Sequence, residues 1–395
     1  MNATLEKART AGTTSGRKKD RLPVSLSAEE MNEFGREADL IREEVMQDRG
    51  ERDARYIHRL IRVQRWLAIG GRLLIFASLA FLPQWGHAFA QSIYFWSVMV
   101  SGVFALGCAK IIENMEIGHN VLHGQWDWMR DPEIQSSSWE WDNVCPSAQW
   151  RQSHNVTHHT WTNVIGKDSD VAGYGLLRMF PEQRWKRFNL GNPIYALLLA
   201  LFFEWGIAIQ ELELGLVLSG HRKYSKLRPL FRQTGRKIAR QGLKDYLLFP
   251  ALAGPFFLYV FCANAVACMI RNLWTYVIIF CGHFSGGVHV FTSRQVENES
   301  RGQWYVRQIL GSCNIGGGKL FHIMSGNLSH QIEHHMYPDM PSNRYPEVAP
   351  RVRELCARYN IPYNTGSLTR QFGFAVWRIL RMTFPGPARP LAARS

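Results

Sequence analysis

Apolar residues gather in long stretches separated by polar and charged segments. The first stretch runs from Trp66 to Leu82 and the second from about Ser92 to Ile112. Each is close to the roughly 20 residues that a helix needs to cross a bilayer core. The short segment between them lacks Lys and Arg, which predicts a turn on the non-cytoplasmic side. Arg72 lies in the first half of the first stretch, where its side chain can reach toward the headgroups.

A third apolar stretch, Ile194 to Leu218, differs from the first two because it contains three glutamates. The segment after it, His221 to Lys244, is rich in Lys and Arg and has no acidic residue. A crossing by the third stretch would put this basic block outside the cell, against the positive-inside tendency. The pattern therefore predicts an interfacial or re-entrant helix on the cytoplasmic face.

Two further crossings are predicted at about Tyr246 to Cys262 and Asn264 to Cys281, with almost no loop between them. Arg271 falls inside the last crossing, and the sequence offers no partner for its charge. The expected fold is thus an all-α integral membrane protein. It has four transmembrane helices in two hairpins and a cytoplasmic helical cap that carries the polar, histidine-rich segments.

The same pattern divides the chain into four regions. Residues 1–26 are expected to be a disordered basic tail, and residues 27–65 a cytoplasmic helical region that begins at a Ser27 cap. Residues 66–345 form the membrane domain with its transmembrane and cap helices. Residues 346–395 form a cytoplasmic C-terminal region.

The formal net charge of +14 is high enough to suggest nucleic acid as a partner. Membrane topology explains it better, because Lys and Arg gather in particular loops where they meet anionic lipid headgroups. The first sixty or so residues lack the apolar core of a signal peptide, so they are expected to stay in the cytoplasm. Seven scattered cysteines without a Cys-x-x-Cys pair indicate neither a zinc knuckle nor a disulfide framework.

Eight of the fourteen histidines fall in three tight clusters. The first directly follows the second predicted span, and the other two share the form His-x3-His-His. All three are predicted on the cytoplasmic side. The clusters are His119 and His123, then His154, His158 and His159, and finally His330, His334 and His335.

Neutral imidazole is a common ligand of divalent transition metals, and eight imidazoles exceed what one ion can coordinate. Two metal ions are therefore implied. Zinc is the weaker alternative because its sites close with four ligands and often use cysteine. His283 lies where the last span leaves the membrane on the same side and is a candidate ninth ligand. The isolated histidines are expected to be structural or exposed, namely His58, His87, His221, His289 and His322.

Three polar residues near the clusters are candidates for supporting the ligands. Glu116 lies one helical turn before His119, and Glu333 lies inside the third cluster. Either carboxylate can hold the N–H group of a ligand ring, or it can be solvated. Asn327 can bind a metal directly or through water, or it can cap a turn.

The chain resembles the membrane fatty acid desaturase family, whose signature is three histidine boxes, from about Ile111 to Pro338. Its phrases around the boxes are similar to those of bacterial acyl-CoA desaturases of mycobacteria and pseudomonads, which act at the delta-9 position. These phrases are Lys110-Ile-Ile-Glu-Asn-Met-Glu-Ile-Gly-His119-Asn-Val-Leu-His123 and Ser325-Gly-Asn-Leu-Ser-His330-Gln-Ile-Glu-His-His335. The resemblance implies a di-iron centre, with dioxygen as co-substrate, ligated by the eight clustered histidines and His283.

The third box also resembles that of front-end desaturases, but the His-Pro-Gly-Gly motif of their fused cytochrome b5 domain is absent. A Gly-rich nucleotide fingerprint and an iron–sulfur cysteine pattern are absent as well. Electrons are therefore expected from a separate reductase or ferredoxin-type donor.

The predicted function is oxygen-dependent desaturation of a saturated fatty acyl chain at a bacterial inner membrane, with the active site facing the cytoplasm. Acyl-CoA and the delta-9 position are expected, and an acyl-lipid is the alternative substrate. A di-iron hydroxylase, epoxidase or carotenoid oxygenase remains an alternative, because the product depends on the fine positioning of oxidant and carbon. A non-enzymatic metal transporter or sensor is a further alternative. It would place ligands within the spans, whereas these clusters follow or lie outside them.

Overall fold

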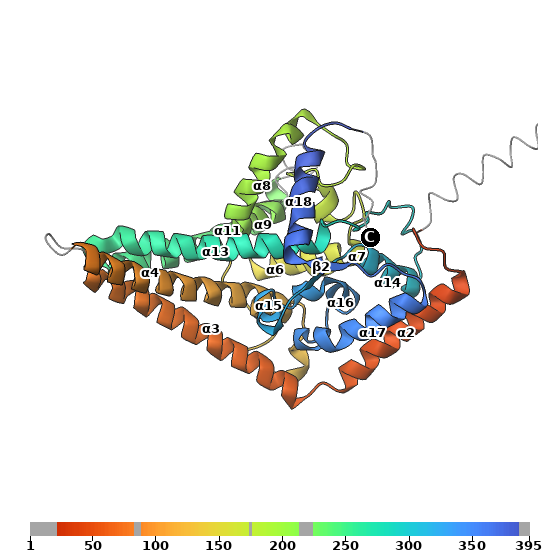
Figure 1. The fold of residues 1–395 in the computed structure, drawn as a ribbon, viewed down its shortest axis with the longest axis horizontal. Helices are drawn as coiled ribbons and strands as arrows, with labels where there is room; N and C mark the ends of the chain where they lie inside the picture. The colour runs from red at the N-terminus through yellow and green to blue at the C-terminus, as the bar shows by residue number, and fades with distance from the viewer. Residues whose placement is uncertain (1–21, 83–87, 174–175, 213–223, 387–395) are drawn as a thin grey trace, which may run out of the picture.

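The computed structural model describes residues 22–82, 88–173, 176–212 and 224–386. Long helices form an elongated bundle at one end, and shorter helices form a cap at the other (Figure 1). The longest helices are α2 (Ala28–Gln47), α3 (Glu51–Ser78), α4 (Ala88–Ile111), α11 (Tyr224–Gly242) and α13 (Phe257–His283). Most of residues 1–26, the predicted tail, lie outside the described residues.

Shorter elements complete the fold. The α-helices are α5 (His119–Leu122), α6 (Ser147–Arg151), α7 (His159–Trp161), α8 (Asn192–Leu201), α9 (Phe203–Glu211), α12 (Phe249–Leu252), α14 (Arg301–Leu310), α15 (Lys319–Met324), α16 (Gln331–Met336), α17 (Tyr345–Arg358) and α18 (Leu368–Met382). The π and 3-10 segments are η1 (Leu79–Phe81), η2 (Ile112–Gly118), η3 (Asp127–Met129), η4 (Gln152–His158), η5 (Ser169–Gly173), η6 (Arg187–Gly191), η7 (Leu243–Leu248), η8 (Gly254–Phe256), η9 (Leu328–His330) and η10 (Ser342–Arg344). Strands β1 (Asn314–Gly316) and β2 (Thr365–Ser367) pair in parallel.

Three helical runs are long and apolar enough to cross a membrane, namely Glu51–Phe81, Phe89–Leu122 and Gly254–His283. A fourth is possible if the bent pair Arg187–Leu201 and Phe203–Glu211, which meet at 103°, is counted as one span. The mostly helical membrane fold and the first two predicted spans are thus confirmed. The bent pair is either a broken span or a re-entrant segment, so the interfacial or re-entrant helix expected for Ile194 to Leu218 stays a prediction, and residues 213–218 of that stretch lie outside the described residues.

The second predicted hairpin has its turn in the wrong place. We expected the chain to turn between Cys262 and Asn264, but α13 runs through both without a break. The break lies earlier at Gly254 and Pro255, where Gly254 has a φ of +56°. Left-handed backbone favours glycine, and proline cannot continue a helix, whereas no residue around Ala263 breaks one. Tyr246 to Cys262 is therefore not a span of its own.

Helices α3 and α4 approach closely through two glycines. A Cβ atom on Gly71 would lie 2.7 Å from the backbone nitrogen of Leu106, and one on Gly102 would lie 2.8 Å from that of Ile75. Small residues at the interfaces of membrane helices allow such close backbone contact. Van der Waals packing then stabilises the helix pair, because lipid provides no hydrophobic driving force between helices.

The charges inside the bundle pair with one another. Asp245 of η7 accepts hydrogen bonds from Arg72 at 3.0 Å and from Lys110 at 2.9 Å. Lys110 also donates to Asp142 at 2.8 Å. A buried charge is tolerated when it is paired and hydrogen-bonded, and this network joins α3, α4 and η7. Arg72 therefore has a partner within the protein as well as a route to the headgroups.

Arg271, which the sequence left without a partner, lies in α13 and is fully buried. Its guanidinium forms an ion pair with Glu204 of α9. It also donates to the side chain of Asn272 at 3.1 Å and to the backbone oxygen of Asp142 at 3.0 Å. The ion pair fixes the bent α8–α9 segment against the bundle.

The cap has a core of its own in which α2, α14, α16 and α17 meet. Ser27 caps α2 through a reciprocal pair of hydrogen bonds with Glu30, as its sequence predicted. Buried Arg344 joins the cap to the start of α3 through a 2.7 Å contact with Asp53. Farther along, α18 returns to pack against α13. The region predicted to begin at residue 346 therefore shares the cap core.

Removing one partner of the Arg271–Glu204 pair should destabilise the fold strongly. Glu204→Ala leaves the guanidinium buried without its carboxylate, which costs about 3–5 kcal/mol for a typical buried pair. The double variant Glu204→Leu/Arg271→Met removes both charges and should recover most of that loss. Thermal unfolding of the detergent-purified proteins, followed by tryptophan fluorescence, measures both. Equal stability of Glu204→Ala and the parent chain would show that the pair does not stabilise the fold.

Candidate metal centre

The first histidine cluster extends the second span beyond its apolar part. Helix α4 continues through the π-helical η2 into α5, where His119 and His123 lie four residues apart on one face. The helix of the second span thus continues past its apolar part and carries the first cluster. A π segment inserts an extra residue into a helix and is frequent at functional sites.

The other clusters also begin in short, irregular helices. His154 and His158 lie in the π-helical η4, and His159 begins α7. In the third cluster, His334 and His335 lie in α16. These segments belong to the cap, so the clusters bring the end of a span and two cap segments together.

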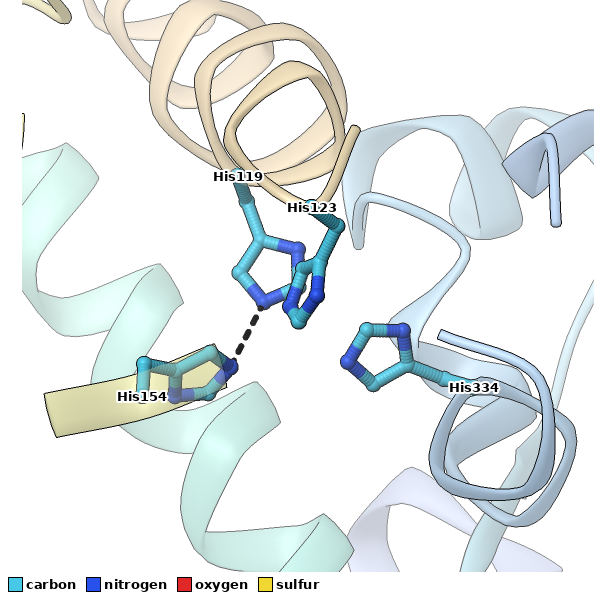
Figure 2. A group of neighbouring side chains, drawn as sticks. All are labelled: His119, His123, His154 and His334. Atoms are coloured by element: carbon cyan, nitrogen blue, oxygen red, sulfur yellow. Dashed lines mark hydrogen bonds between the residues drawn. The ribbon is translucent and has the colours of Figure 1, made fainter. Parts of the chain in front are cut away.

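One group of imidazoles joins three segments of the chain. His119, His123, His154 and His334 each offer a ring nitrogen, and these atoms all lie within 4.8 Å of one another. Figure 2 shows the four rings converging on a common space between α5, η4 and α16. The Nε2 atoms of His119 and His154 are 3.3 Å apart. Such a group could hold a single metal ion.

A second group lies beside the first. His158, His283 and His335 meet in the same way, and the Nε2 atoms of His283 and His335 are 3.2 Å apart. His159 lies between the groups, because its ring nitrogen clusters with those of His334 and His335. The structure therefore brings together eight of the nine histidines proposed as ligands.

The ring nitrogens are suited to metal binding because several of them form no hydrogen bond within the described structure. Among the described residues, Nε2 of His123, of His158 and of His334 is buried without a hydrogen-bond partner. Both ring nitrogens of His159 are also unpartnered. A buried polar atom without a partner is costly, and a metal ion shared among them would remove that cost.

Burial also keeps most of these rings neutral. Desolvation lowers the pKa of His154, His159, His334 and His335 well below the usual range, and the neighbouring histidines lower it further. A neutral imidazole has a free lone pair, which is the form that binds metal.

His158 differs because two carboxylates lie at its other nitrogen. Its Nδ1 lies 3.1 Å from Oδ1 of Asp168 and 3.4 Å from Asp170. Burial favours the neutral ring, but the two carboxylates outweigh it and raise the pKa of His158 to about 9. A carboxylate that accepts from Nδ1 directs Nε2 toward a metal. Sequence reasoning missed Asp168, although the acidic pair ten residues after the ring was a usable signal.

His330 lies outside both groups. Its ring stacks on His322 with the ring centres 4.6 Å apart. Helix α16 begins one residue later, so Gln331, His334 and His335 share one helical face and His330 does not. Gln331 instead lies beside the second group, with its Nε2 2.9 Å from Nε2 of His283 and with its Oε1 unpartnered among the described residues.

The three residues proposed to support the ligands form hydrogen bonds with other parts of the protein. Glu116 accepts hydrogen bonds from Tyr56 at 2.8 Å and from Asn327 at 3.0 Å. Glu333 accepts from Asn314 and Tyr363, each at 2.8 Å. In the described structure their carboxylates contact no histidine ring.

Other polar side chains contact the outer nitrogens of the rings. Nδ1 of His119 lies 3.1 Å from Oδ1 of Asn120, and Nδ1 of His335 lies 3.2 Å from the hydroxyl of Thr162. Nδ1 of His334 lies 3.3 Å from the hydroxyl of Tyr345. These contacts orient the rings. None was signalled in the sequence, because hydroxyl and amide residues occur throughout the chain.

A mostly apolar cavity of about 450 Å³ reaches the histidines. His119 and His154 of the first group and His158 and His283 of the second form part of its wall. Its apolar lining includes Met115, Trp150, Leu199, Phe203, Ile207 and Phe280. Trp150, which lies between the first two clusters in the sequence, thus forms part of the cavity wall.

A model of the fatty acid desaturase family matches residues 94–367, a range that includes every histidine of the two groups. The chain belongs to the fatty acid desaturase family. This desaturase is 48% identical over 359 residues to the Mycobacterium tuberculosis (strain H37Rv) protein named NADPH-dependent stearoyl-CoA 9-desaturase, an alignment that covers 90% of this chain and 80% of the relative. It is 25% identical to a Synechocystis protein named sn-1 linoleoyl-lipid 6-desaturase, over 67% of this chain and 75% of that relative. The resemblance in the histidine boxes is confirmed.

Metal content should distinguish His330 from the grouped histidines of the desaturase. A ring nitrogen of His334 belongs to two groups, one with His119, His123 and His154 and one with His159 and His335. The purified His334→Ala variant should therefore lose about half or more of its bound metal. His330→Ala is the matched control and should keep the full amount. Elemental analysis of both proteins measures this difference. Full metal content in His334→Ala would remove that ring from the ligand set.

Asp168→Ala should weaken metal binding without touching a ligand. Loss of the carboxylate frees the His158 ring to rotate, and losses of such supporting contacts lower metal affinity by about 10–100-fold. Competition with a chelator measures the affinity. Asp170→Ala should have a smaller effect, since this more exposed carboxylate lies farther from Nδ1. An equal or larger effect of Asp170→Ala would contradict the role given to Asp168.

Proposed function

We propose that this desaturase introduces a double bond at the delta-9 position of a saturated long-chain acyl-CoA, using two iron ions, dioxygen and electrons from a separate protein. The observation that supports it best is the apolar cavity whose wall contains histidines of both groups. The delta-9 position and the CoA carrier rest on the 48% identity to the mycobacterial stearoyl-CoA 9-desaturase.

The two groups suggest how two ions would be held. His119, His123, His154 and His334 would bind one ion, and His158, His283 and His335 the other. His159 lies where it can complete either set, and the Gln331 amide oxygen is available to the second ion. Iron is proposed because the chain belongs to the fatty acid desaturase family, and imidazole is a ligand that suits iron.

The iron pair, when bound, supplies the oxidising power needed to remove hydrogen from an unactivated methylene. The protein holds the chain and excludes water. Phe203, Ile207 and Phe280 provide an apolar wall for the chain, and packing against it would limit which carbon reaches the histidines. Each double bond removes two hydrogens from the chain, reduces one dioxygen to two waters and consumes two electrons and two protons.

The cap is proposed to face the cytoplasm of a bacterial inner membrane. Arg59, Arg62 and Arg65 lie exposed at the cap end of α3, directly before the exposed Trp66. Lys and Arg at the end of a span favour the cytoplasmic side, and tryptophan favours the headgroup level.

Expression in a desaturase-deficient host tests the function. Gas chromatography with double-bond location should show a new delta-9 unsaturated acid that depends on oxygen. His158→Ala should remove the product while leaving the protein in the membrane, because it deletes a ligand ring; His289→Ala, which lies outside both groups, is the matched control and should retain it. A hydroxylated or epoxidised product would overturn the desaturase proposal but keep the metal centre. Full product from His158→Ala would contradict the centre itself.

A further inference from the structure

Three tyrosines of the cap are fully buried beside the metal centre. Tyr345 begins α17, Tyr337 directly follows α16, and Tyr305 lies in α14. Figure 1 shows these three helices beside one another in the cap. A buried tyrosine needs a partner for its hydroxyl, so each of these rings imposes a requirement that phenylalanine would not.

Short contacts connect these tyrosines with a ligand ring at one end and with the surface at the other. The rings of Tyr345 and His334 have their centres 6.0 Å apart, and the Tyr345 hydroxyl donates to the Tyr337 backbone oxygen at 3.1 Å. The ring centres of Tyr337 and Tyr305 are 5.8 Å apart, and those of Tyr305 and Trp304 are 5.1 Å apart. Trp304 is only partly buried. The three tyrosines and Trp304, here called the aromatic path, therefore lead from the metal centre to the protein surface.

Tyr305 is the member of the path best placed to lose an electron. Its hydroxyl donates to Oδ1 of Asp39 at 2.5 Å. An oxidised phenol is a strong acid, so a carboxylate that takes its proton makes the oxidation easier. The Asp39 side chain is 38% exposed, which lets the proton exchange with water. The hydroxyls of Tyr345 and Tyr337 donate to backbone oxygens, which are too weakly basic to take a proton.

The aromatic path suits the loss of electrons from the protein surface toward the metal centre. Phenol and indole rings give an electron to a strong oxidant, but they do not accept one from a biological reductant. The proposed function provides such an oxidant, since hydrogen must be removed from an unactivated methylene. Packing alone requires neither the hydroxyls nor a sequence of oxidisable rings from a ligand to the surface.

An empty cavity leaves the oxidant without its substrate. An acyl chain in the cavity supplies two hydrogens for each dioxygen that is reduced. Without it, oxidisable side chains near the centre are at risk, and Trp150 stacks on His154 with ring centres 4.2 Å apart. Trp150 also forms part of the cavity wall, so its oxidation would damage the site. A supply of electrons from the surface would prevent this.

We propose that the aromatic path protects the desaturase by supplying electrons to the metal centre when dioxygen is reduced there without an acyl chain. This inference rests on the proposed function, which provides the oxidant. In each of two one-electron steps, Tyr305 loses an electron to the centre through the two inner tyrosines, and its phenolic proton moves to Asp39. An electron from a small one-electron reductant such as ascorbate then reaches Tyr305 through Trp304, and Asp39 returns the proton. These two electrons replace those of the acyl chain, and with two from the donor and four protons they convert dioxygen to two waters.

The test detects oxidised side chains in the full chain, held in nanodiscs. The iron-loaded protein is reduced without oxygen and then mixed with dioxygen in the absence of acyl-CoA. Freeze-quench electron paramagnetic resonance should show a tyrosyl radical. Mass spectrometry should find oxidised residues in the tryptic peptide 302–307, which contains Trp304 and Tyr305. Protein freed of metal by a chelator should show neither, and a saturated acyl-CoA should lower both because the acyl chain then supplies the electrons.

Tyr337→Phe interrupts the path while keeping a ring in the cap core. This variant should lose most of the tyrosyl signal and most of the oxidation of peptide 302–307, and oxidation should appear at Trp150 instead. Its initial rate of product formation should match that of the parent chain. Its activity should fall faster during repeated exposure to reductant and dioxygen without acyl-CoA, and ascorbate should protect the parent chain but not the variant.

The matched control is Tyr359→Phe. Tyr359 also lies in the cap, and its hydroxyl donates to Glu37 at 2.7 Å, but its ring contacts no member of the path among the described ring pairs. Each variant loses one hydroxyl hydrogen bond, so the thermal stability of the two should fall by similar amounts. Tyr359→Phe should keep the radical, the oxidised peptide and the resistance to inactivation of the parent chain.

Three outcomes would overturn the proposal. The first is a parent chain that forms unsaturated product but shows no oxidation of peptide 302–307. The second is equal oxidation of the metal-free protein, which would assign the damage to oxidants free in solution. The third is the same loss in both phenylalanine variants, which would reflect stability alone. Because the radical is measured without acyl-CoA, absence of any unsaturated product would count against the proposed function and leave the radical measurement readable.

Discussion

Eight imidazole rings lie against one another, six of them buried and His123 and His154 half-buried, and the packing around them must keep them in place. A buried ring nitrogen needs a partner, and neighbouring rings in a dry site disfavour protonation of one another. The rings must therefore stay largely neutral and point at something they can share. Holding them so closely takes a rigid frame, which here is built from the ends of two long helices and from short cap helices that pack on them.

The bundle meets a related constraint with its own charges. Arg271 and Glu204, like Lys110 and Asp245, are held in apolar surroundings only because each has a partner. These pairs lie between helices, so they fix how the helices sit as well as neutralising charge. The bent α8–α9 segment, which lines the cavity, is joined to α13 in this way. The shape of the cavity therefore depends on the Arg271–Glu204 ion pair, which lies outside the cavity.

Much of the fold was readable because it follows from length and hydropathy. The first two spans were predicted, whereas the turn before α13 was misplaced. Hydropathy continues evenly across that region, and Gly254 and Pro255 were a better guide than the apolar average. The partner of Arg271 was out of reach, because Glu204 is remote in sequence and meets it only through the fold.

The candidate metal centre, like the fold, was predicted in part from the sequence. Recurrent spacing identified the histidine clusters, and the structure gathers eight of the nine proposed rings. The spacing did not show that Gln331, and not His330, lies beside the grouped rings. Which of the two does so depends on the residue at which α16 begins. Asp168 was missed because a turn, and no helical period, brings it back to His158.

Each histidine group combines residues of a membrane span with residues of the cap, and this affects how long the protein stays folded. His119 and His123 end a membrane helix, while His154 and His334 belong to the cap, so an ion bound by all four would tie the two parts together. Ligands that bind only the folded state add their binding energy to its stability. We expect the metal-free chain to open at this seam and to become a substrate for proteases. Metal occupancy would then set how long each molecule persists as well as whether it works.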